Sequence, residues 1–126
     1  MSTIIGLGLD ATDIPRIAAT MERYGDRFIQ RIFTDGEIAY CSRRRVPAIH
    51  FAGRFAAKEA AMKALRVGDR AVSWREVEVQ RAADGAPTLV LRGAAAALAA
   101  EAGLSHFALS VTHERTYASA IVVASA

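Results

Sequence analysis

Apolar and polar residues alternate along five stretches of the chain and follow a helical period along most of the others. Alternation predicts β-strands, whose successive side chains point to opposite faces of a sheet, and the strands expected are residues 3–10, 74–81, 88–93, 106–113 and 117–124. Apolar residues spaced three and four apart predict four helices after the first strand and an alanine-rich helix at residues 94–103. Helices segregated from hairpins in this order predict an α+β fold with a mainly antiparallel sheet.

Capping residues mark where the predicted helices begin. Thr12 or Asp13 can cap the first helix, because their side-chain oxygens accept hydrogen bonds from the free amides of the first turn. Thr34 and Glu37 have the spacing of a capping box, in which each side chain bonds to the backbone amide of the other residue. Pro47 is expected to start the longest helix.

The segment FAGRFAAKEAAMKAL, residues 51–65, predicts a helix with a charge where a core residue is expected. At 100° per residue, Lys58 falls inside the stripe of large apolar residues, which are Phe51, Phe55, Met62 and Leu65. Arg54 and Glu59 flank this stripe, and the opposite side is mostly alanine and glycine, which indicates close packing on a neighbouring element. A covered charge must be paired or bound to a ligand, but a lysine can also extend its ammonium group into water.

Asp10 ends the first predicted strand and shares a face with Gly6 and Gly8. The glycines leave room beside the carboxylate for a ligand or another backbone; alternatively, Asp10 only supports the turn into the helix. Asp10 and Glu59 are hard oxygen ligands, and the sequence has no cysteine–histidine cluster with zinc spacing. One or two carboxylates with phosphate oxygens and water are typical of Mg²⁺.

Arginines and a histidine complete the candidate residues. Arg16, Arg23 and Arg27 lie opposite the apolar stripe of the first helical region and, with Arg31, would form a basic ridge. The alternative is an ordinary solvated face. His113 ends a predicted strand, where a histidine can be structural or catalytic.

Composition restricts the class of protein. A chain of 126 residues with 52% hydrophobic residues suits one domain, residues 1–126, with a substantial core. No apolar run reaches the roughly 18 residues of a membrane span, and the first residues do not resemble a signal peptide. Cys41 is the single cysteine, as expected for a reducing cytoplasm.

The net charge of +3 mildly favours an anionic partner. A small basic nucleic-acid-binding module is therefore the non-enzymatic alternative. Such a module needs aromatic side chains available for stacking, but aromatic residues are only 7% and carboxylates lie among the cations. We therefore expect no nucleic-acid partner and no membrane association.

These stretches together resemble one family, the holo-acyl-carrier-protein synthases of the 4′-phosphopantetheinyl transferase type. GLGLDATDIPRI, residues 6–17, is similar to the N-terminal signature of the family, and FAGRFAAKEAAMKAL is similar to its second signature. FTDGE, SWREVEV, DGAPTLVLRG and LSVTHERTYASAIVV follow in the order of the family, so the resemblance covers nearly the whole chain.

The resemblance implies transfer of the 4′-phosphopantetheine group from coenzyme A to a serine of an acyl carrier protein, with Mg²⁺ as cofactor. Adenosine 3′,5′-bisphosphate would be released. Asp10 and Glu59 would hold the metal, and the catalytic group would be Asp10, Glu59, Lys63 and His113. The serine proton would pass to Glu59 directly or through a metal-bound water molecule. A non-catalytic homologue that only binds coenzyme A is a second alternative.

The resemblance also implies the binding surfaces. The coenzyme would contact Arg54, Lys58, Lys63, Gly68, Pro87 and His113, and the carrier protein would dock on Arg16, Arg23 and Arg27. The family is trimeric with sites between subunits, which offers a second explanation for the glycine face of the first strand.

The sequence departs from the family pattern at three places. Thr112 precedes the final histidine where serine is common, and RVG at residues 66–68 replaces Gly-Thr-Gly. Ala86 replaces a lysine that could bind phosphate. None of these departures affects the two carboxylates.

Overall fold

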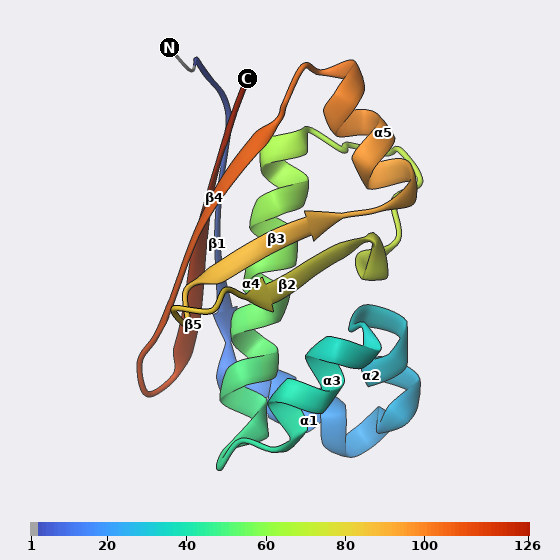
Figure 1. The fold of residues 1–126 in the computed structure, drawn as a ribbon. Helices are drawn as coiled ribbons and strands as arrows, with labels where there is room; N and C mark the ends of the chain where they lie inside the picture. Colours follow the sequence, from blue (N-terminus) through green and yellow to red (C-terminus); the bar gives the residue numbers. More distant parts are fainter. Residues whose placement is uncertain (1–2) are drawn as a thin grey trace.

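The computed structural model describes residues 3–126, and within them the predicted order of helices and strands is confirmed (Figure 1). Asp13 caps the first helix, and Thr34 with Glu37 completes both halves of the capping box. The elements are β1 (Ile4–Asp13), α1 (Ile14–Tyr24), α2 (Asp26–Ile32), α3 (Asp35–Ser42), α4 (Pro47–Leu65), η1 (Trp74–Glu76), β2 (Val77–Arg81), β3 (Pro87–Leu91), α5 (Gly93–Glu101), β4 (His106–His113) and β5 (Tyr117–Ser125).

The strand expected at residues 74–81 is wrong at its start. Residues Trp74–Glu76 form a short 3-10 helix, and the strand begins only at Val77. Ser73 and Glu76 close a second capping box here, since the Ser73 amide donates to Glu76 Oε1 over 2.7 Å. A local polar motif therefore overrides the alternating pattern of this segment.

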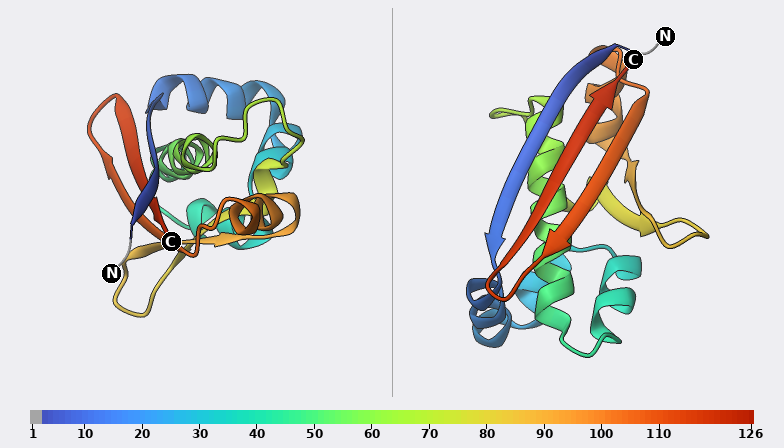
Figure 2. Two further views of the ribbon diagram at one scale, coloured as in Figure 1. Left: turned by 90° about the horizontal axis from the view of Figure 1, so that it is seen from above. Right: turned by 90° about the vertical axis from the view of Figure 1, so that its left-hand side faces the viewer.

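The strands form two antiparallel layers around a central helix. One sheet has the order β1–β5–β4, and β2 and β3 form a separate hairpin. Figure 2 shows α4 lying along one face of the three-stranded sheet, with α1 and the hairpin on its other sides. The predicted α+β class with antiparallel sheets is confirmed.

The glycines of β1 allow this strand to touch the backbone of α4. A Cβ atom on Gly6 would lie 2.3 Å from the carbonyl oxygen of Ala64, and one on Gly8 would lie 1.7 Å from that of Ala60. The glycine face is therefore an intramolecular contact, and its interpretation as a contact between subunits is wrong. The alanine side of α4 completes this close packing, as the sequence predicted.

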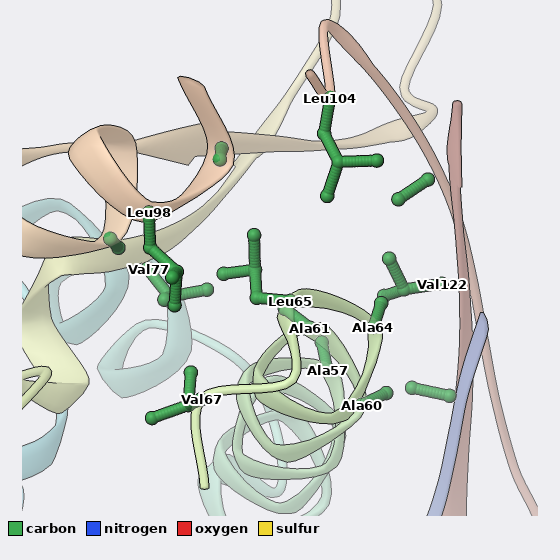
Figure 3. Packing of buried hydrophobic residues seen from close by; sticks show 14 of the residues in the cluster. Ala57, Ala60, Ala61, Ala64, Leu65, Val67, Val77, Leu98, Leu104 and Val122 are labelled. Atoms are coloured by element: carbon green, nitrogen blue, oxygen red, sulfur yellow. The ribbon is translucent and has the colours of Figure 1, made fainter. Parts of the chain in front are cut away.

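The main core lies between α4, the inner face of the sheet, the hairpin and α5. Figure 3 shows small residues of α4, such as Ala57, Ala60 and Ala61, surrounded by larger side chains that include Val77, Leu98 and Val122. Small helical residues and branched strand residues thus share the interior, which brings the helix close to the sheet.

The opposite face of the sheet is uncovered in the single chain. Leu7 and Leu9 of β1 are 62% and 63% exposed, and Ile121 of β5 is 38% exposed. Leu7 is paired with Val123, and Leu9 with Ile121, so these side chains form one continuous apolar surface. Within residues 3–126, no helix combines the length and the apolar character that crossing a membrane requires.

Candidate functional site

The two predicted metal ligands, Asp10 and Glu59, lie side by side at the edge of the sheet. β1 places Asp10 on the face that packs on α4, and α4 presents Glu59 toward it. Burial raises the pKa of Glu59, and the neighbouring Asp10 carboxylate raises it further. Two carboxylates held this close repel each other when both are ionised, so a cation between them would be stabilising.

Lys63 joins this pair from the next turn of α4. Its ammonium group lies 3.2 Å from Asp10 Oδ1 and donates to the carbonyl oxygen of Leu9 over 3.0 Å. Thr12 donates its hydroxyl proton to Asp10 Oδ2 over 3.2 Å, which fixes the carboxylate from the other side. The side chain of Lys63 is 56% exposed, so this lysine can still reach a ligand.

A cavity of about 310 Å³ opens beside the carboxylates. It is lined by Asp10 and Glu59, by Arg16 of α1, and by the rings of Phe28 and Phe55. An adjacent hollow contains Arg27 and Tyr24, and Arg23 lies over the Tyr24 ring at 5.2 Å. The predicted basic ridge therefore borders the cavity that contains Asp10 and Glu59, which we call the acidic cavity.

The donor set fits Mg²⁺ that is shared with a substrate. Residues 3–126 contain no group of three or more histidine, cysteine or carboxylate side chains suited to hold a metal alone. Two carboxylates leave coordination positions for phosphate oxygens and water, which is the usual arrangement for Mg²⁺ at phosphate-transfer sites. The residues present are thus compatible with the predicted metal.

Lys58 is not available to the coenzyme, and its predicted role as a phosphate-binding cation is wrong. Its side chain is fully buried, with the ammonium nitrogen 2.7 Å from Glu37 Oε1. The same nitrogen donates to the carbonyl oxygens of Trp74 and Val77, which uses all three of its protons. Nor does Lys58 extend into water, which was the alternative interpretation.

Glu37 has a structural role that the sequence did not predict. Besides capping α3, it pairs with Lys58 and accepts a hydrogen bond from the amide of Val79 over 2.8 Å. The ion pair therefore joins α3, α4 and β2 in the interior. The available signal was the lysine inside an apolar stripe, which required a buried partner.

A second, basic cavity lies on the hairpin side of α4. It has a volume of about 210 Å³ and is lined by Arg54, Pro87 and His113, three of the predicted coenzyme contacts. His50 and Arg81, which the sequence analysis missed, line the same cavity. Arg54 is 8% exposed, and its guanidinium lies 4.2 Å from the centre of the Tyr40 ring.

Helix α4 separates the two cavities, which have no lining residue in common. Asp10 pairs with Ala120 on β5, and His113 pairs with Ala118, so both point toward α4 from the two edge strands. Within one chain, the first group of predicted site residues lies at the acidic cavity: Asp10, Glu59, Lys63 and Arg16. The second group lies at the basic cavity: Arg54, Pro87 and His113. Gly68 lines neither cavity; it follows α4 with a φ of +59°.

Comparisons with known proteins agree on one family. A profile of the 4′-phosphopantetheinyl transferase superfamily matches residues 6–122. The holo-acyl-carrier-protein synthase of Koribacter versatilis is 47% identical over 121 residues, which are 95% of this chain and 97% of that protein. The synthase from Neisseria meningitidis superposes with a TM-score of 0.88 at 34% identity, covering 97% of this chain and 98% of that one. The Helicobacter pylori synthase in complex with coenzyme A gives 0.82 at 28% identity, covering 94% and 98%.

Proposed function

The chain belongs to the 4′-phosphopantetheinyl transferase superfamily, and on that premise we propose that it is a holo-acyl-carrier-protein synthase. It transfers the 4′-phosphopantetheine group from coenzyme A to a serine of an apo-acyl carrier protein and releases adenosine 3′,5′-bisphosphate. The observation that carries this proposal is the group formed by Asp10, Glu59 and Lys63 beside an open cavity, in a chain similar to such synthases over nearly its whole length. The nucleic-acid-binding alternative is not supported.

The carboxylates Asp10 and Glu59 would hold Mg²⁺ against the coenzyme diphosphate. The metal would supply charge neutralisation for the phosphoryl group that is transferred. Lys63, which contacts Asp10, is placed to bind a diphosphate oxygen. Thr12 keeps the Asp10 carboxylate in one orientation, so its free lone pairs point to a constant position.

The carrier protein would approach along the arginines of α1 and α2. Arg16 lines the cavity that contains the carboxylates, and Arg27 lines the adjacent hollow. Acidic residues of a carrier protein paired with Arg16, Arg23 and Arg27 would bring the serine to this cavity.

Arg54, Pro87 and His113 would bind the far end of the coenzyme, in the basic cavity. Since α4 separates this cavity from the carboxylates of the same chain, we propose a homotrimer whose sites combine the acidic cavity of one protomer with the basic cavity of its neighbour. The uncovered apolar face of β1 and β5 supports association. We further propose that residues 1–126 act as one domain in the cytoplasm.

One assay tests the function. The protein is incubated with coenzyme A, MgCl₂ and an apo-acyl carrier protein, and the intact mass of the carrier is measured. The proposal predicts a gain of one phosphopantetheine group that depends on Mg²⁺ and is lost in Glu59→Gln. A folded protein that binds coenzyme A but leaves the carrier mass unchanged would instead be the non-catalytic homologue.

A further inference from the structure

Tyr40 of α3 lies at the centre of an unusual group of cations beside the basic cavity. The guanidinium groups of Arg44, Arg54 and Arg81 lie 5.2, 4.2 and 5.2 Å from the centre of its ring. The Tyr40 hydroxyl also accepts a hydrogen bond from Arg81 over 2.7 Å. The ring therefore holds charges that would otherwise repel each other.

Two histidines extend this group across the cavity. The His50 ring lies 6.1 Å from the Tyr40 ring and 6.2 Å from the His113 ring, measured between centroids. The residues that line the cavity include four basic side chains and no carboxylate; the basic ones are His50, Arg54, Arg81 and His113.

The arginines of this group have no carboxylate partner among the described residues. Among residues 3–126, no salt bridge involves Arg44, Arg54 or Arg81. The Nε atom of Arg54 is buried and has no hydrogen-bond partner in the same range. A covered guanidinium with an unused donor requires an acceptor, and the acceptor that suits several convergent cations is a phosphate dianion.

We propose that Arg81, fixed on Tyr40, and His50 complete a phosphate-monoester subsite, and that coenzyme A binds there with uptake of a proton by His50. This inference rests on the proposed function, and the group bound is the terminal 3′-phosphate of the coenzyme. Arg81 faces Pro87 across the hairpin, so it supplies a cation next to the position where Ala86 supplies none.

The surroundings of His50 explain the proton uptake. Burial lowers the pKa of His50, and Arg44, Arg54, His113 and Arg81 lower it further. A neutral imidazole is therefore favoured near pH 7 in the free protein. A phosphate dianion placed among these groups stabilises the imidazolium and raises the pKa of His50. Binding should then strengthen as the pH falls from above the ligand-bound pKa toward the free pKa.

Titration calorimetry with coenzyme A and dephospho-coenzyme A, which lacks the 3′-phosphate, tests the subsite. The wild-type protein should bind coenzyme A about tenfold or more tightly than the dephospho form, the size expected for charge-assisted hydrogen bonds. Arg81→Gln should remove most of this preference, and Tyr40→Phe, which keeps the ring and loses the hydroxyl, should remove less. Arg70→Gln, on a surface ion pair with Glu101, is the control and should preserve it. Equal preference in wild type and Arg81→Gln would overturn the assignment.

The same titrations at pH 7.5 in PIPES, HEPES and Tris count protons, because the observed heat varies with the ionisation enthalpy of the buffer. The ligand phosphate itself titrates near pH 6, so the comparison with His50→Gln isolates the imidazole. Wild type and the control His106→Gln should take up more protons than His50→Gln. Identical buffer dependence in all three would refute the linkage. The carrier-mass assay on the wild-type protein tests transfer separately, so either idea can fail alone.

Discussion

The two sides of helix α4 differ in charge and in how that charge is held. On the α1 side, Asp10 and Glu59 form an acidic pair that one exposed lysine partly neutralises. On the hairpin side, arginines and histidines gather around Tyr40 without a carboxylate lining the cavity. The acidic side is suited to a divalent metal and the basic side to phosphate. A single ligand can satisfy both sides if it is a nucleotide with a metal-bound diphosphate and a further phosphate group.

The same helix also carries two lysines whose charges are held in different ways. Lys58 and Lys63 are five residues apart, but Lys58 is fully buried on Glu37 whereas Lys63 is 56% exposed beside Asp10. The charged residues of one helical motif can thus differ: some are buried in ion pairs, and others are exposed and can reach a ligand. Burial and the number of unused hydrogen-bond donors distinguish them.

The largest effect is expected on the acidic side. Asp10→Asn and Glu59→Gln keep the size of each side chain and remove one negative charge, so each should lower kcat/KM by about 10²- to 10⁴-fold, as expected for loss of metal-assisted charge stabilisation. Turnover is measured against Mg²⁺ concentration, with circular dichroism to confirm folding. A folded double variant with near-normal, Mg²⁺-dependent turnover would contradict the assignment of both carboxylates.

The two lysines should respond in opposite ways. Lys58→Met leaves Glu37 buried without its partner and should lower the free energy of unfolding by about 3–5 kcal/mol. Lys63→Met breaks an exposed pair and should cost about 0–1 kcal/mol, while its kcat/KM falls about tenfold or more through the lost contact to phosphate. Urea unfolding and steady-state kinetics on both variants provide the comparison.

A double variant serves as the control for the lysines. Lys58→Met combined with Glu37→Gln removes both charges, so it should be more stable than Lys58→Met alone if an unpaired carboxylate causes the loss. Equal stability of Lys58→Met and Lys63→Met would mean that the buried pair contributes nothing, contrary to its geometry.

A smaller effect is expected at the rim of the acidic cavity. Arg16→Glu should raise the KM for the carrier protein about tenfold and leave the KM for coenzyme A unchanged, because reversing a rim charge acts on association. Wild-type turnover at low carrier concentration should fall as NaCl is added. Arg70→Glu, outside both cavities, is the matched control. A higher KM for coenzyme A with an unchanged KM for the carrier would show that Arg16 contacts the coenzyme. That result would contradict its assignment to carrier-protein docking.

Local signals predicted the order of elements but not the contact between the two carboxylates. Capping residues, prolines and alternation are read over a few residues, so the boundaries at Asp13, Thr34 and Pro47 agree with the structure. The start of the strand predicted at Trp74 does not agree with the structure, because the Ser73–Glu76 capping box competes with the strand pattern. Asp10 and Glu59 could be paired only through the family resemblance, since β1 and α4 are far apart in sequence.

The roles of Lys58 and of the basic cavity depend on tertiary contacts. No local pattern links Lys58 to Glu37, 21 residues earlier, and no spacing places Tyr40 beside Arg81 on another element. His50 did leave a signal that the sequence analysis did not use. It precedes Arg54 by four residues, so both lie on one face of α4.

Mixed trimers test whether an acidic half and a basic half from neighbouring protomers form each site. Asp10→Asn and Arg54→Gln chains with different tags are produced together, and trimers that carry both tags are isolated. In a cyclic trimer with either 2:1 composition, one of the three interfaces joins an intact acidic half to an intact basic half. We therefore expect about one third of the wild-type turnover, measured at a coenzyme A concentration where each parent trimer is nearly inactive. Turnover no higher than that of the parent trimers would contradict it and would place each complete site within one chain.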